Sequence, residues 1–252
     1  MLFRSLELYR EVGDRDGECF VLPALGRIAV QRGDYAYASA LYVQALDLAR
    51  SLGGRLSEAY ILHSQGELAA EQSEHDRAVT LYNQALELAK DLGDRRLQAR
   101  SLLALGSLWA RRGRLLAARN LFDQALAMGL SIGARELEAA SMIQIGNVHA
   151  AMSEPDQFGD LLERALEIYR EIDLPVAQAE TLHSLGHLSA QLGRTETARR
   201  HLTEAREIYR SLDLTAEREE VDTLLASLGG EVPADRLSLR LQPPHSGRDS
   251  VR

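Results

Sequence analysis

The chain has 252 residues, of which 45% are hydrophobic but only 5% aromatic, and it carries a net charge of −8. This composition is typical of packed helices, and the negative charge argues against nucleic acid as the main ligand. The single cysteine excludes an intrachain disulfide and a thiolate metal cluster, which fits a reducing cytoplasm. No apolar run approaches the roughly 20 residues that span a bilayer, so we expect no membrane partner.

A fixed internal period of forty residues dominates the chain. Its clearest mark is a glycine step, which recurs as Leu25-Gly26, Gln65-Gly66, Leu105-Gly106, Ile145-Gly146 and Leu185-Gly186. An alanine series follows at Ala45, Ala85, Ala125, Ala165 and Ala205, with a large residue three places before each, at Tyr42, Tyr82, Phe122, Leu162 and Leu202. A period of this length indicates a stack of identical supersecondary units.

Each period contains two stretches with apolar residues at helical spacing, separated by a turn glycine such as Gly33, Gly113 or Gly193. Each unit is therefore predicted to be a helix pair. The predicted units span residues 14–53, 54–93, 94–133, 134–173 and 174–213, preceded by a half repeat at 1–13 and followed by a capping helix at 214–229 and a disordered tail at 230–252.

The half repeat is predicted to have one open apolar face. Residues 2–12 align with the second helix of a unit, and no first helix precedes them in the sequence. Because terminal repeats normally need a polar outer face, we expect either a longer solenoid or a second subunit at this end.

Two units break the pattern. Pro23 stands where the other units have residues inside the first helix, so we expect that helix to be kinked or to start late. In the fourth unit, Phe158 replaces the small residue of the second helix, as found at Ala38 or Ala78. The bulky ring is expected to spread the helix pair or to delay its second helix.

These residues resemble the tetratricopeptide repeat over positions 14–213. One unit matches its pattern at Leu62, Gln65-Gly66, Ala78, Tyr82 and Ala85, and the next at Leu102, Leu105-Gly106, Ala118, Phe122 and Ala125. The period is longer than the usual 34 residues, and it is similar to the forty-residue subclass of bacterial regulator sensor domains and peptide-binding adaptor scaffolds. The resemblance implies an all-α fold, a right-handed α-solenoid of antiparallel helix pairs.

In the family fold the first helices line a concave groove, which predicts the residues that contact a partner. Reading one row per first helix gives Phe20, Arg27, Tyr60, His63, Glu67, Arg100, Leu103, Arg111, Ile143, Asn147, His183 and His187. This mixture suits an extended or helical peptide with apolar anchors and some acidic character. The family's clamp for a C-terminal carboxylate uses Lys and Asn, and the chain departs from it because Ile143 stands four residues before Asn147.

Glu180, His183 and His187 share one helical face, which is a spacing that could bind zinc. No Glu follows the first histidine as in His-Glu-x-x-His, so we interpret the pair as polar groove lining and expect no metal and no cofactor. No nucleophile with an adjacent base is evident, and we expect no enzymatic activity.

Two functions fit these features. The first is a scaffold for a protein or peptide partner, as a regulatory or adaptor module. The alternative is a self-assembling structural module that forms a homodimer through residues 2–12.

Overall fold

The computed structural model of the chain describes residues 2–152 and 154–228. Within these ranges it contains twelve α-helices and no β-strand. They are α1 (Leu2–Val12), α2 (Arg15–Gln31), α3 (Tyr35–Ser51), α4 (Arg55–Glu71), α5 (His75–Leu92), α6 (Arg95–Arg111), α7 (Leu115–Ile132), α8 (Arg135–Ala151), α9 (Pro155–Glu171), α10 (Pro175–Gln191), α11 (Thr195–Ser211) and α12 (Thr215–Ser227). The tail predicted at 230–252 lies outside the described residues.

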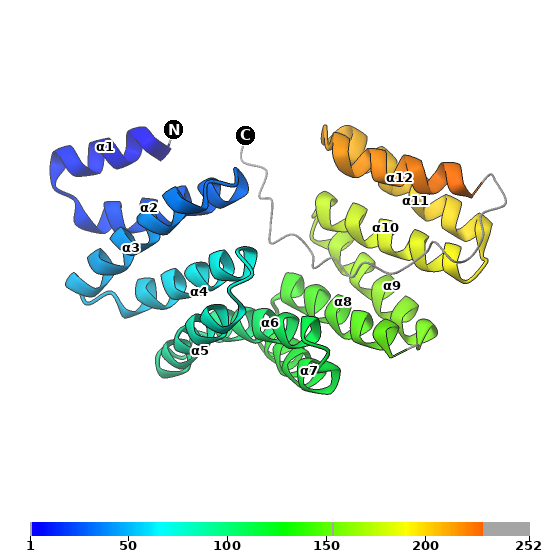
Figure 1. Cartoon of the computed structure of the whole chain (residues 1–252), viewed down its shortest axis with the longest axis horizontal. Helices are drawn as coiled ribbons and strands as arrows, with labels where there is room; N and C mark the ends of the chain where they lie inside the picture. Colours follow the sequence, from blue (N-terminus) through cyan, green and yellow to red (C-terminus); the bar gives the residue numbers. More distant parts are fainter. Residues whose placement is uncertain (1, 153, 229–252) are drawn as a thin grey trace. The chain divides into compact units, whose positions relative to one another are not determined.

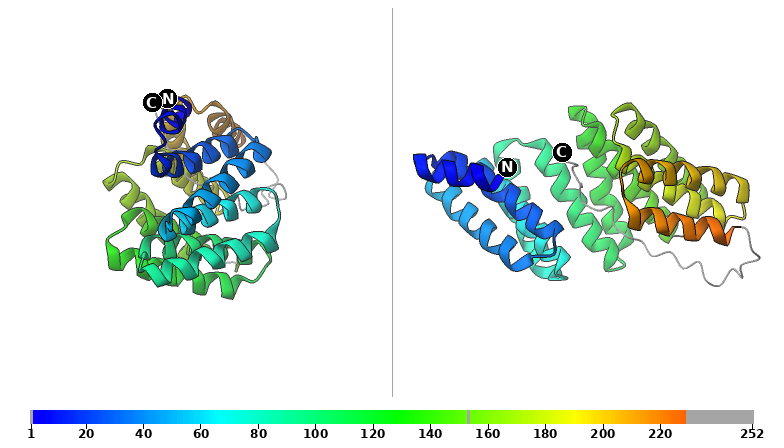
Figure 2. Two further views of the ribbon diagram at one scale, coloured as in Figure 1. Left: turned by 90° about the vertical axis from the view of Figure 1, so that its left-hand side faces the viewer. Right: turned by 90° about the horizontal axis from the view of Figure 1, so that it is seen from above.

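Consecutive helices pack in pairs, as Figures 1 and 2 show. The most extensive contacts join α2 to α3, α4 to α5, α8 to α9 and α10 to α11, and the end helices α1 and α12 pack on α2 and α11. The predicted all-α fold, an α-solenoid of antiparallel helix pairs, is confirmed. The contacts divide the chain into two compact units, Met1–Met128 and Gly129–Arg252, with the boundary inside α7.

A large side chain packed on a glycine joins the two helices of each pair. A Cβ atom built on Gly66 would lie 2.7 Å from a ring carbon of Tyr82, and one built on Gly106 would lie 2.4 Å from a ring carbon of Phe122. In the fifth pair the residue is a leucine, and a Cβ built on Gly186 would lie 2.5 Å from Leu202 Cγ. These separations are far shorter than a carbon–carbon contact. The glycine series therefore exists because the first helix must let a large side chain of the second helix lie against its backbone.

The fourth pair makes the same contact with a different residue. Its second helix has Leu162 at the position of the ring, and Phe158, one helical turn earlier, packs on Gly146 instead, where a built Cβ would lie 2.9 Å from its ring. Phe158 is only 4% exposed. The expectation that this ring delays the second helix is wrong, because the ring fills the space that Leu162 leaves, and α9 begins at Pro155, in register with the other second helices.

Pro23 does not shift the first helix of its pair. The helix α2 runs from Arg15 to Gln31, the same register as α4, so the expectation of a late start is wrong. The start is fixed by Asp14, whose side chain accepts a hydrogen bond from the Gly17 N–H at 2.9 Å. A capping bond of this kind satisfies one of the free N–H groups of the first turn.

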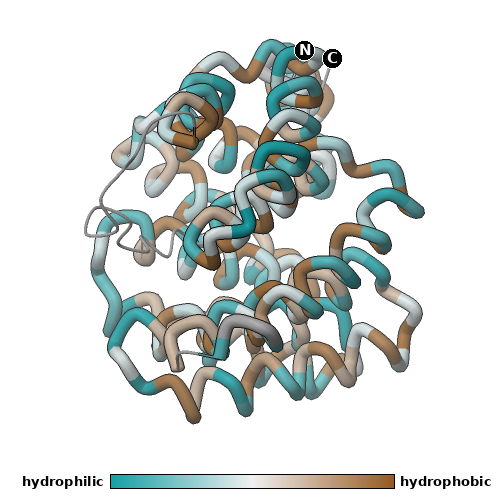
Figure 3. The backbone as a smooth tube through the Cα atoms, turned by 90° about the vertical axis from the view of Figure 1, so that its right-hand side faces the viewer, coloured by the Kyte–Doolittle hydropathy of each residue, from teal (hydrophilic) through white to brown (hydrophobic). Residues whose placement is uncertain are grey.

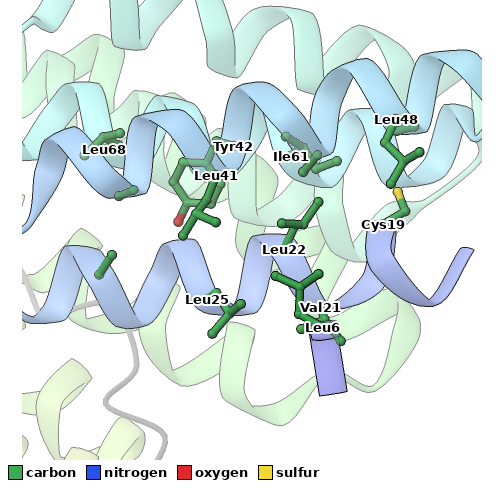
Figure 4. Packing of buried hydrophobic residues seen from close by; sticks show 14 residues of the cluster. Leu6, Cys19, Val21, Leu22, Leu25, Leu41, Tyr42, Leu48, Ile61 and Leu68 are labelled. Carbon is green, nitrogen blue, oxygen red and sulfur yellow. The ribbon is translucent and has the colours of Figure 1, made fainter. Parts of the chain in front are cut away.

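The apolar residues gather between the helices of each unit. Figure 3 shows hydrophobic and hydrophilic positions alternating along the helices. In the first compact unit, one cluster joins α2, α3 and α4 (Figure 4). Its almost fully buried members include Leu22, Leu25, Tyr42 and Ile61. This burial is the main source of stability, because each such side chain contributes roughly 1.5–3 kcal/mol.

The helix α1 buries one side and exposes another. Leu6 is buried and Tyr9 packs against Gly17 of α2, whereas Leu8 and Val12 are exposed. The homodimer through residues 2–12 stays a prediction.

Replacing Gly66 by Ala should destabilise the chain. The added methyl group overlaps the Tyr82 ring, and overpacking of this kind costs about 1–3 kcal/mol, more than the roughly 1 kcal/mol that alanine gains in a helix. The thermal unfolding midpoint of Gly66→Ala should therefore fall below that of the wild type.

The matched control is Gly159→Ala, also inside a helix. A Cβ there would meet only Leu188 Cδ2, at an ordinary 3.5 Å, so the midpoint should stay level or rise. A fall of the same size in both variants would show that the ring contact is not the cause.

Candidate partner-binding surface

The predicted partner-contacting residues of the first compact unit, Met1–Met128, lie on three neighbouring first helices. The first helices α2, α4 and α6 form this layer, since α4 contacts both of the others. Phe20 is 80% exposed, and Arg27 and Arg111 are also exposed. The half-buried members are Tyr60, Glu67, Arg100 and Leu103. We refer to these seven residues together with His63 as the first-helix face.

His63 lies inside the packing instead of on the surface. Its side chain is 3% exposed, and its ring packs against that of Tyr82 in a tilted arrangement at a centroid distance of 5.2 Å. Nδ1 lies 3.2 Å from Ser101 Oγ, and Nε2 lies 3.3 Å from Glu67 Oε1. His63 therefore offers little surface to a partner, but it joins α4 to α6 and holds the Glu67 carboxylate in place.

Glu67 remains a carboxylate at this position. Burial alone would raise its pKa, but the charge and the hydrogen bond of His63, with the charges of Arg100 and Arg27, lower the pKa to about 2. An ionised Glu67 accepts from the Nε2–H of His63, and the other ring nitrogen, Nδ1, faces the Ser101 hydroxyl. Arg100 Nη2 donates to the same Glu67 oxygen at 3.4 Å.

Two tyrosine rings of the second helices reach toward this carboxylate. Burial raises the pKa of Tyr42 and of Tyr82, and the negative charge of Glu67 is the next cause for both. The charge of Glu67 therefore acts on both buried tyrosines.

Tyr60 is tied to the end of a neighbouring helix. Its hydroxyl donates to Asp94 Oδ2 at 2.9 Å, while Asp94 Oδ1 accepts from the Leu97 N–H at the start of α6. Burial raises the pKa of Tyr60, and Asp94 adds to this rise. The side chain that was predicted to contact a partner therefore also holds Asp94, whose carboxylate caps α6.

Ser101 was missed by the sequence reading, although a signal was present. The same repeat position is apolar in the first two forty-residue repeats, at Val21 and Ile61. It then carries a hydroxyl at Ser101, Ser141 and Thr181. All five side chains are buried. A hydroxyl in a buried apolar register predicts a polar partner nearby, and for Ser101 that partner is His63.

The order Ser101, His63, Glu67 resembles the line of groups in a serine hydrolase, but the site cannot act in that way. A nucleophile must reach the substrate, and Ser101 has no exposed surface at all. The line of hydrogen bonds positions Glu67 and does no covalent chemistry.

The predicted partner-contacting residues of the second compact unit are half-buried, and they carry fewer charges than the first-helix face. Ile143 packs against the apolar cluster that contains Phe158 and Leu188, and Asn147 lies one turn further along α8. Burial lowers the pKa of His183 and of His187, and the His187 charge lowers that of His183 further. Among the described residues, no group of three or more His, Cys, Asp or Glu is placed to hold a metal ion.

Family models described as "Tetratricopeptide repeat" match residues 22–56, 57–131 and 137–211. The chain belongs to the tetratricopeptide repeat family. Its period of forty residues is longer than the usual 34. The packing of a large side chain on a glycine recurs in each of its helix pairs. None of the curated protein sequences matches the chain. None of the helices in the described ranges is long and apolar enough to cross a membrane.

Solved structures share this tetratricopeptide repeat architecture. BtubC from P. vanneervenii has a TM-score of 0.68 at 19% identity, over 84% of this chain and 89% of its own. The Rap conjugation gene regulator of plasmid pLS20, in complex with the Phr* peptide, has 0.74 at 19%, over 85% of this chain and 60% of its own. NprR in complex with its cognate peptide NprX has 0.70 at 13%, over 92% and 69%. At these identities the likeness shows the fold alone.

Replacing Ser101 by Ala should destabilise the first compact unit, Met1–Met128. The substitution leaves Nδ1 of the buried His63 without its hydroxyl partner, and an unsatisfied buried polar group costs about 1–3 kcal/mol. Thermal and urea unfolding of the variant measure the loss.

Ser141→Ala is the matched control, because Ser141 has the same repeat position and the same complete burial. Its hydroxyl donates to the Leu137 carbonyl of its own helix, so its loss should be clearly smaller. Equal losses in the two variants would contradict the role assigned to the His63 contact.

Proposed function

We propose that this chain is a scaffold without enzymatic activity that binds a peptide or a partner protein along its first helices, as a regulatory or adaptor module. One observation carries the proposal. Phe20 is 80% exposed on the same helix as exposed Arg27, and the two are seven residues apart, which places them on one helical face. Aromatic and arginine side chains are the types that dominate binding energy at interfaces.

The chemistry of the first-helix face indicates the kind of ligand. Phe20 and the half-buried Leu103 offer apolar contact, and Arg27, Arg100 and Arg111 offer guanidinium groups that pair with carboxylates. A peptide with apolar anchors and acidic side chains complements both.

In the second compact unit, four further residues are proposed to contact a partner: Ile143, Asn147, His183 and His187. The lowered pKa of both histidines keeps their rings uncharged at neutral pH. Such rings donate and accept hydrogen bonds without a net charge. This part of the surface is therefore suited to backbone or amide groups of a ligand.

The structural neighbours support the proposal by analogy. The Rap regulator of plasmid pLS20 and NprR are both described in complex with a peptide. A shared fold does not fix a shared ligand, so these complexes support the class of partner and leave its sequence open.

Binding should depend on the first-helix face. The full chain, immobilised, is used to select peptides from a random library, and the dissociation constants of the selected peptides are measured by fluorescence anisotropy. In the double variant Phe20→Ala, Arg27→Gln, affinity should fall at least about tenfold, since interface anchors of these types contribute 2 kcal/mol or more.

The matched control is Leu116→Ala, Arg77→Gln, which changes an exposed apolar residue and an exposed arginine on second helices. Its affinity should equal that of the wild type. Failure of the wild type to select any peptide, or equal losses in both double variants, would refute the proposal.

A further inference from the structure

The first-helix face has an unusual distribution of charge, from which a more specific inference follows; it rests on the proposed function. Between positions 95 and 119 the sequence has seven arginines and no aspartate or glutamate. Two of them, Arg100 and Arg111, belong to the first-helix face. Arg100 lies against α4, where its Nη2 donates to Glu67 Oε1. The helix α6 therefore carries positive charge beside the Glu67 carboxylate.

Glu67 places a negative charge beside Arg100. The buried ring of His63 lies 3.3 Å from its Oε1, and the fully buried Ser101 contacts His63 from the other side. Arg100 contacts the same oxygen at 3.4 Å, but its side chain is 39% exposed. Glu67 is therefore positioned by buried groups, whereas Arg100 has exposed surface that a ligand can contact.

A quarter of the Glu67 side-chain surface is exposed. Both of its contacts, with His63 and with Arg100, use Oε1, and a carboxylate has lone pairs on both oxygens. Oε2 therefore remains a further acceptor site within reach of a ligand that lies against Arg100.

A ligand carboxylate that approaches Arg100 consequently meets the fixed negative charge of Glu67. Like charges brought together at an interface discriminate strongly between partners. The repulsion is relieved when the same ligand carries an ammonium or guanidinium group beside its acidic group. Because Arg100 and Glu67 are in contact, the two ligand groups must belong to neighbouring residues.

We propose that Glu67 is a specificity-determining residue that selects peptides in which a basic residue, or a free amino terminus, stands next to an acidic residue. Arg100 takes the acidic group and Glu67 takes the basic group. A ligand that is acidic alone binds more weakly.

The test uses a random-peptide library and three forms of the full chain: the wild type, Glu67→Gln and Arg100→Gln. Glutamine at 67 removes the charge but keeps an oxygen that accepts from His63, so the packing is retained, and far-UV circular dichroism checks the helicity. The wild type should enrich neighbouring basic and acidic residues. Glu67→Gln should lose the basic preference, with about a tenfold smaller affinity ratio between a selected peptide and its Lys→Met or Arg→Met analogue.

Arg100→Gln should do the reverse, losing the acidic preference and keeping the basic one. Glu71→Gln is the control, because Glu71 is exposed one turn further along α4. The carboxylate that contacts His63 and Arg100 is that of Glu67. It should select the same peptides as the wild type.

The inference is overturned if Glu67→Gln and the wild type enrich basic residues equally, or if Glu71→Gln loses the preference to the same extent. In both cases peptides are still selected, so the proposed function survives. If the wild type selects no peptide, the proposed function and this inference fail together.

Discussion

The structure depends on one contact, the packing of a large side chain from each second helix on a glycine of the first. This side chain is a ring in the first four pairs and Leu202 in the fifth. The absence of a Cβ at Gly26, Gly66 and Gly106 allows ring carbons to approach to where a methyl group would stand. This close approach fixes the distance between the helices of a pair. Since the same contact returns every forty residues, each pair presents the same face to the next, and the pairs stack.

The candidate binding surface is a consequence of this packing. The rings of Tyr42 and Tyr82 fill the space over the glycines. His63 packs against Tyr82 and contacts Ser101 of α6, so it is held between α4 and α6. The Glu67 carboxylate is therefore positioned by buried groups of two repeats.

The period made most of the fold predictable, because small and large residues alternate in a register that only helix pairs explain. The exchange of Leu162 for Phe158 at the glycine contact was not predictable. Leu162 matches Leu202, which packs on Gly186 itself, and only the distance from Gly146 to Phe158 shows that the fourth pair differs. The burial of His63 was missed for a similar reason. Its position lies at the edge of the packing stripe, and the side it faces is decided by Ser101 on another helix, which the periodicity of one helix cannot show.

The central claim is that each pair needs one large side chain packed on its glycine, whichever position supplies it. The most direct measurement compares the thermal midpoints of Phe158→Ala and of Phe158→Ala, Leu162→Phe. Loss of the buried ring alone costs about 3–5 kcal/mol, while the double variant restores the ring at the position that Phe122 has in the preceding pair. The account predicts that the double variant recovers most of the lost stability. A double variant no more stable than Phe158→Ala would contradict it.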